Sequence, residues 1–134
     1  MTFEEYCEQL EQKIQDAYTN GISLEDAEKL AGEFLVAQMR TSRELKNADL
    51  DSRMKKSGLK AVRATAYRTI AANPEKKPTE AAIAAAIDVD PLVGKEQDSY
   101  DAAEVDKASL ERYFNVFQNA HIFYRGVAKG SFGG

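Results

Sequence analysis

The sequence is short of the residues that most often carry catalysis and metal binding. It contains no tryptophan, one cysteine and one histidine among its 134 residues. The single cysteine, Cys7, excludes an internal disulfide framework and fits a reducing, cytoplasmic environment. The single histidine, His121, leaves no histidine pair for a zinc site and no cysteine–histidine pair at a motif spacing. We interpret Cys7 as a packing or surface residue and His121 as a packing or hydrogen-bonding residue of a helix.

Long apolar runs and glycine-rich loops are also absent. No stretch approaches the roughly 18 apolar residues of a membrane-spanning helix, and the acidic N-terminus lacks the apolar core of a secretory signal. The segment from Lys129 to Gly134 has the wrong residue order for a phosphate-binding loop. Asp88 and Asp90 could form a metal-binding pair, but an acidic helix cap explains them more simply. The sequence therefore predicts no membrane attachment, no cofactor and no enzymatic activity.

The charge that is present is sorted by position. Residues 1–39 carry nine acidic and two basic residues, a net charge of −7. Residues 40–77 carry eleven basic and four acidic residues, a net of +7, and residues 78–134 carry a net of −4. A chain with a formal net charge of −4 thus contains a strongly basic middle. Such a surface attracts polyanions, which suggests an acidic partner.

Apolar residues recur at helical spacing along most of the chain, which predicts an all-α fold. Thr2 begins a helix that stops at Asn20-Gly21, and a second helix starts after Ser23. The polar stretch 45–58 leaves open whether this second helix continues or breaks near Asn47 or Gly58. It is expected to end at Asn73-Pro74.

Two further helices follow the proline. A short, alanine-rich helix is expected over Glu80–Ile87. Asp90-Pro91 is a strong start signal for a long final helix that reaches about Arg125. We expect a single helical domain over residues 1–134, an elongated hairpin or bundle. It consists of an acidic-then-basic part, residues 1–77, and C-terminal oligomerisation helices, residues 78–130.

The final helix has an apolar side that is unusually rich in aromatic residues. A broad apolar stripe on a long helix often packs against another subunit, which predicts a homo-oligomer. The alternative, that the stripe is core of its own chain, stays open at this point. The residues predicted for oligomerisation are Leu110, Tyr113, Phe114, Phe117 and Tyr124.

The sharpest functional signal lies in the basic middle. On one continuous helix, the side chains of Arg53, Lys56, Lys60, Arg63 and Tyr67 follow spacings of 3, 4, 3 and 4 and share an arc of about 80°. We call these five residues the basic stripe.

The basic stripe has the composition of a phosphate-binding surface. Cations at one-turn spacing suit a phosphate backbone, and a tyrosine ring can stack on an unpaired base. Lys55, Arg40, Arg43 and Lys46 could extend the surface. An apolar stripe lies beside it on the helix and could pack against the rest of the protein; its members are Leu59, Val62, Ala66 and Ile70. No base-reading motif is present, so binding should depend strongly on salt and weakly on sequence.

The run from Met54 to Tyr67 resembles the basic core of the UvsY-type recombination mediators of bacteriophages. That core has two adjacent lysines, here Lys55 and Lys56, then Leu-Lys-Ala, an arginine and a tyrosine within about a turn. The resemblance implies an oligomer, a ring in that family, that binds single-stranded DNA. It implies loading of a RecA-like recombinase onto strands covered by single-strand-binding protein, in the host cytoplasm. By this resemblance Lys60, and then Arg63, contact DNA.

Two functional interpretations therefore remain open. The first is a non-enzymatic recombination mediator that binds single-stranded DNA. The second is a helical phage structural, assembly or host-interaction factor without nucleic-acid binding, whose basic face docks an acidic protein surface. A purely structural interpretation stands beside both: the basic stripe is a solvated helix face with some salt bridging to the acidic N-terminal helix.

Overall fold

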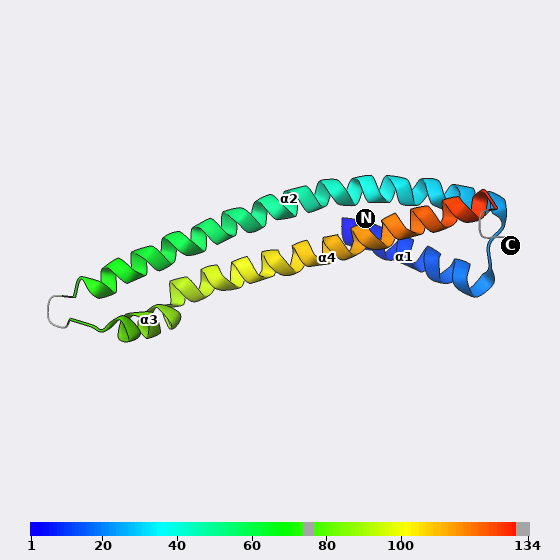
Figure 1. Ribbon diagram of the computed structural model, residues 1–134. Helices are drawn as coiled ribbons and strands as arrows, with labels where there is room; N and C mark the ends of the chain where they lie inside the picture. The colour runs from blue at the N-terminus through cyan, green and yellow to red at the C-terminus, as the bar shows by residue number, and fades with distance from the viewer. Residues whose placement is uncertain (74–76, 131–134) are drawn as a thin grey trace. The chain divides into compact units, whose positions relative to one another are not determined.

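The computed structural model describes residues 1–73 and 77–130, and they form four α-helices in chain order (Figure 1). These are α1 (Phe3–Asn20), α2 (Leu24–Ala71), α3 (Glu80–Asp88) and α4 (Pro91–Ala128). No strand occurs within these ranges. The predicted all-α fold and the long C-terminal helix are thus confirmed. Pro74, expected to end the second helix, lies outside the described residues.

The helix starts follow the capping signals of the sequence. The hydroxyl of Thr2 accepts a hydrogen bond from the Glu5 amide at 3.1 Å, and that of Thr79 accepts one from the Ala82 amide at 3.2 Å. Asp90 Oδ1 accepts from the Leu92 amide at 2.8 Å and from the next amide at 3.2 Å. Asp90 is therefore a helix cap, and each side chain satisfies amides that the first helical turn leaves without a partner.

Gly21 ends α1. Its φ of 76° lies in the left-handed region, which glycine adopts without steric cost, and its amide donates to the Ala17 carbonyl at 2.9 Å. Among the described residues, no helix is long and apolar enough to cross a membrane.

The chain packs as two compact units, and α2 and α4 each contribute to both. The first unit consists of Met1–Leu45 and the described part of Ser109–Gly134, and the second consists of the described part of Lys46–Ala108. Each unit therefore combines residues from the N-terminal part, 1–77, with residues from the C-terminal part of the chain.

The core of the first unit is built around aromatic rings of α2 and α4. Phe34 and Phe117 are fully buried, with ring centroids 5.8 Å apart, and Phe34 stacks on Tyr124 at 5.7 Å. Tyr113 stacks on Phe117 at 5.8 Å. The core is completed by Cys7 and Leu10 of α1 together with small residues of α2 and α4.

This core corrects the oligomerisation role expected for three of the aromatic residues. Tyr113, Phe117 and Tyr124 are buried against their own chain, so they offer no surface to a second copy. The intrachain alternative holds for them, because α1 and α2 together supply enough apolar surface to cover this side of α4. Leu110 and Phe114 are half-buried, and self-association through them stays a prediction.

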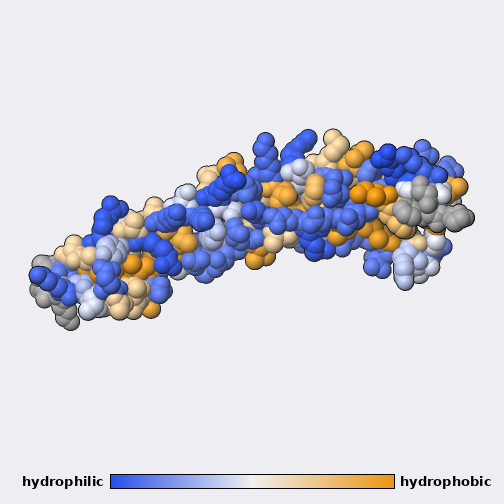
Figure 2. Space-filling view, in the orientation of Figure 1, coloured by the Kyte–Doolittle hydropathy of each residue, from blue (hydrophilic) through white to orange (hydrophobic). Residues whose placement is uncertain are grey.

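The core of the second unit is smaller and aliphatic. Leu59 and Ala66 of α2 are buried against Ile83 and Ile87 of α3 and Val93 of α4. Val62 and Ile70 pack against the same cluster, so the apolar stripe predicted on this helix is confirmed. The described surface is largely hydrophilic with smaller hydrophobic areas, as one face shows in Figure 2.

Candidate nucleic-acid interface

The basic stripe lies on one uninterrupted stretch of α2 in the second unit. The helix runs through Gly58, so the continuity that the stripe requires is confirmed. Gly58 is not there to avoid a clash, since a Cβ at this position would meet only Glu96 Oε2, at an ordinary 3.6 Å. Continuous helical geometry therefore places the five stripe residues on one face.

The structure exposes all five stripe residues and separates Lys55 from them. The side chain of Arg53 is 77% exposed, and Tyr67 is 41% exposed as a whole residue. Lys55 is half-buried, and its Nζ donates a hydrogen bond to Ser99 Oγ of α4 at 2.9 Å. Lys55 was predicted as a nucleic-acid-binding residue, and its ammonium group is instead turned toward α4.

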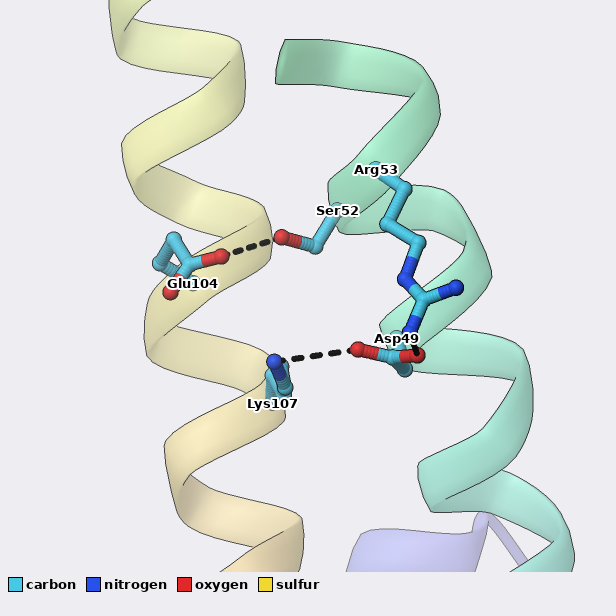
Figure 3. A network of polar contacts seen from close by, with 5 residues as sticks. All are labelled: Asp49, Ser52, Arg53, Glu104 and Lys107. Atoms are coloured by element: carbon cyan, nitrogen blue, oxygen red, sulfur yellow. Dashed lines mark hydrogen bonds and ion pairs between the residues drawn. The ribbon is translucent and has the colours of Figure 1, made fainter.

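A polar layer between α2 and α4 holds the N-terminal end of the stripe (Figure 3). Asp49 pairs with Lys107 of α4 at 3.0 Å and with Arg53, one turn along α2, at 3.1 Å. The buried hydroxyl of Ser52 donates a hydrogen bond to Glu104. The hydrogen bond from Lys107 is the main reason that the pKa of Asp49 is lowered, with a smaller contribution from the charge of Arg53.

At the C-terminal end of the stripe, two side chains contact carboxylates of α3. Arg63 lies 3.8 Å from Asp88 Oδ1, and the Tyr67 hydroxyl donates a hydrogen bond to Glu80 Oε1 at 3.0 Å. This hydrogen bond to Glu80 raises the pKa of Tyr67, because the carboxylate favours the protonated phenol. Sequence reasoning missed both contacts, since it considered Glu80 only as a helix start and Asp88 only as a helix cap or half of a metal-binding pair.

The middle of the stripe is open. Lys56 and Lys60 are exposed and have no ion-pair or hydrogen-bond partner within residues 1–73 and 77–130. Leu59, which lies between them in the sequence on the inward face of α2, is buried in the core of the second unit. One side of this stretch is therefore anchored while the other presents two solvated ammonium groups.

The remaining candidate cations do not all belong to this surface. Arg40 lies in the first unit, where its guanidinium carbon stands 4.1 Å from the centre of the Tyr6 ring. Arg43 also lies in the first unit, and the exposed Lys46 begins the second. The candidate interface therefore lies in the second unit.

Neither of the two rare residues forms a reactive site. Cys7 is fully buried, and burial raises the pKa of its thiol to about 11. His121 Nδ1 donates a hydrogen bond to the carbonyl oxygen of Ala31 at 2.8 Å, which links α4 to α2. No group of three or more metal-ligating side chains that could hold an ion is found in the part of the chain that the structure describes.

The arrangement is suited to binding an extended anion. The stripe is a ridge on a helix rather than a cleft, so it can follow a backbone but cannot enclose a small molecule. Its cations are separated by roughly 4.5–6 Å along the helix axis at 1.5 Å per residue, and Tyr67 adds an aromatic surface at one end. Comparisons of this chain with protein-family models, with curated proteins and with solved structures gave no match.

Proposed function

We propose that this chain binds single-stranded DNA through the basic stripe, without sequence specificity. The observation that carries the proposal is the exposed row of cations on an unbroken stretch of α2, which ends in the exposed ring of Tyr67. Phosphates would contact the cations and a base would rest on the ring. A stacked base must be unpaired, which favours a single strand over a duplex.

The broader biological role is proposed from the resemblance of Met54–Tyr67 to phage recombination mediators. In that role the chain assembles as an oligomer and helps a RecA-like recombinase to displace single-strand-binding protein. The measurement is recombinase ATP hydrolysis on covered single-stranded DNA, which the chain should accelerate. A monomeric solution mass would count against this role, because several copies are needed to hold an extended strand.

DNA binding is tested by fluorescence anisotropy of a labelled oligothymidylate at several salt concentrations. Each cation that neutralises a phosphate contributes about −0.7 to the slope of log affinity against log salt for a single strand. Lys60→Ala should therefore weaken binding and make the slope shallower by about that amount. Lys95→Ala is the matched control, because Lys95 is an exposed cation of the same unit outside the stripe.

The outcomes separate the proposal from its alternative. Absence of binding at low salt would reject the DNA-binding function. A Lys60→Ala protein with the affinity and salt slope of the parent would reject it as well. The second candidate is then a structural or interaction factor whose basic face docks an acidic protein surface. It is favoured by one observation: Arg53, Arg63 and Tyr67 already contact carboxylates of this chain.

A further inference from the structure

The short helix α3 brings negative charge to one end of the basic stripe only. Its two terminal acids contact the last two stripe residues: Asp88 faces Arg63 at 3.8 Å, and Glu80 accepts from Tyr67 at 3.0 Å. Lys56 and Lys60 have no such partner among the described residues. The stripe is therefore divided into an open part and a part that faces carboxylates.

The two carboxylates occupy the groups that a nucleic acid would use. A phosphate bound to Arg63 would lie close to Asp88, and the two negative charges would repel each other. A base stacked on Tyr67 would bring its own phosphate toward Glu80. The acids of α3 therefore compete with a strand at these two positions, and they do so in the same chain.

The anchoring of α3 is limited. The helix has nine residues, and only Ile83 and Ile87 are buried, against Leu59 and Ala66 of α2. A helix of this length is marginal by itself and depends on such contacts. The Arg63–Asp88 pair is long, and both side chains are about half exposed or more, so water and salt screen it. A bound strand can replace these contacts without disturbing the α2–α4 pairing.

We propose that Glu80 and Asp88 are a built-in competitor that lowers the affinity of the stripe for nucleic acid and restricts first contact to Lys56 and Lys60. This inference rests on the proposed function. A strand first binds the open cations, and it reaches Arg63 and Tyr67 only when the carboxylates of α3 release them. The acids thereby set how much of the stripe a strand occupies.

The test is the pair of substitutions Glu80→Gln and Asp88→Asn in one protein, measured with the same labelled oligothymidylate. Affinity at low salt should rise about three- to tenfold, because two negative charges are removed beside the bound phosphates. The control is Asp98→Asn with Asp106→Asn, which makes the same change in net charge on exposed positions of α4. Amide hydrogen exchange over Glu80–Asp88 in both proteins without DNA checks that α3 stays folded.

Each outcome decides one of the two proposals. A parent protein that binds, together with a Glu80→Gln/Asp88→Asn protein that binds no tighter than the control, overturns this inference and leaves DNA binding intact. Weaker binding by Glu80→Gln/Asp88→Asn also overturns it, because Glu80 would then position Tyr67 for the strand. Absence of binding by all variants rejects the proposed function, and the inference with it.

A second measurement does not depend on substitutions. Amide hydrogen exchange is followed by mass spectrometry with and without the oligonucleotide. Release of the contacts of α3 should increase exchange in the amides of Glu80–Asp88, while the stripe becomes more protected. Protection of both segments on binding would contradict the competition and show that α3 is part of the bound surface.

Discussion

Lys55 Nζ of α2 donates a hydrogen bond to Ser99 Oγ of α4, at a distance of 2.9 Å. The neighbouring lysine, Lys56, is exposed and has no such partner in residues 1–73 and 77–130. Adjacent positions on a helix point about 100° apart, so two consecutive lysines serve different purposes. Lys55 contributes to the pairing of two helices, whereas Lys56 contributes to the basic stripe.

This difference predicts opposite effects for two neighbouring substitutions. Lys56→Ala should weaken binding to oligothymidylate and reduce the salt slope by about 0.7, with little change in stability. Lys55→Ala should leave the slope nearly unchanged and lower the free energy of unfolding by about 1 kcal/mol, since it removes a side-chain hydrogen bond. Anisotropy titrations and urea unfolding of both proteins measure these effects. Equal effects on the slope would show that Lys55 leaves Ser99 to bind phosphate.

Tyr67 allows the ring and the hydroxyl to be tested separately. Tyr67→Ala should weaken binding by about 1–3 kcal/mol, because a stacked base loses its partner, with little change in the salt slope. Tyr67→Phe keeps the ring and removes the hydrogen bond to Glu80, so this protein should bind at least as well as the parent. Loss of affinity in Tyr67→Phe equal to that in Tyr67→Ala would assign the effect to the hydroxyl.

Local signals in the sequence predicted the helices and the side that the stripe helix buries. Thr2, Thr79 and Asp90 act as caps where their types and positions indicate, because capping depends on residues within one turn. The exposed stripe was predictable in the same way, since periodicity within one helix fixes its faces.

Contacts between helices could not be predicted from such signals. Lys55 and Ser99 are 44 positions apart in the sequence, and nothing local indicates that they meet. The carboxylates of Glu80 and Asp88 likewise reach the stripe only because α3 folds back against α2. The aromatic side of α4 was ambiguous for the same reason: its pattern shows an apolar face but not whether the cover comes from the same chain.

The polar layer at Asp49 should contribute to stability through Lys107 more than through Arg53. The side chain of Lys107 is 29% exposed and that of Arg53 is 77% exposed, so water screens the second pair more strongly. Lys107→Ala should therefore lower the free energy of unfolding more than Arg53→Ala does. Urea unfolding measures both. The ranking is wrong if Arg53→Ala is the more destabilising change.

The first unit should lose stability at alkaline pH. Burial raises the pKa of Cys7 from 9.0 to about 11, and burial is also the first cause of the raised pKa of Tyr113 and the cause of that of Tyr124. The unfolded chain therefore releases protons that the folded chain still holds, so stability is fully present below pH 9 and falls between pH 9 and 11.

Urea unfolding at pH 8, 9 and 10 measures this loss, and Cys7→Ala is the control. Without the thiol, the decline should begin nearer pH 10, where tyrosine in the unfolded chain starts to ionise. The native thiol should also react very slowly with disulfide reagents at pH 8, because it is buried and protonated. Rapid modification of the folded protein would show that this part of the core opens readily.

The last prediction separates core from assembly surface on α4. Phe117 is fully buried and contacts the rings of Phe34 and Tyr113, so Phe117→Ala should destabilise the protein by about 3–5 kcal/mol through lost burial and the cavity left behind. Phe114 is half-buried and outside the core cluster, so Phe114→Ala should lower the free energy of unfolding clearly less.

If the chain self-associates through the part of α4 that stays accessible, Phe114→Ser lowers the solution mass measured by light scattering while the fold is kept. If the parent protein is oligomeric and Phe114→Ser leaves its solution mass unchanged, Phe114 is not part of the assembly surface. If Phe117→Ala instead dissociates an assembly without lowering the free energy of unfolding, the Phe117 ring packs between copies. That result would contradict the complete burial of this ring within one chain.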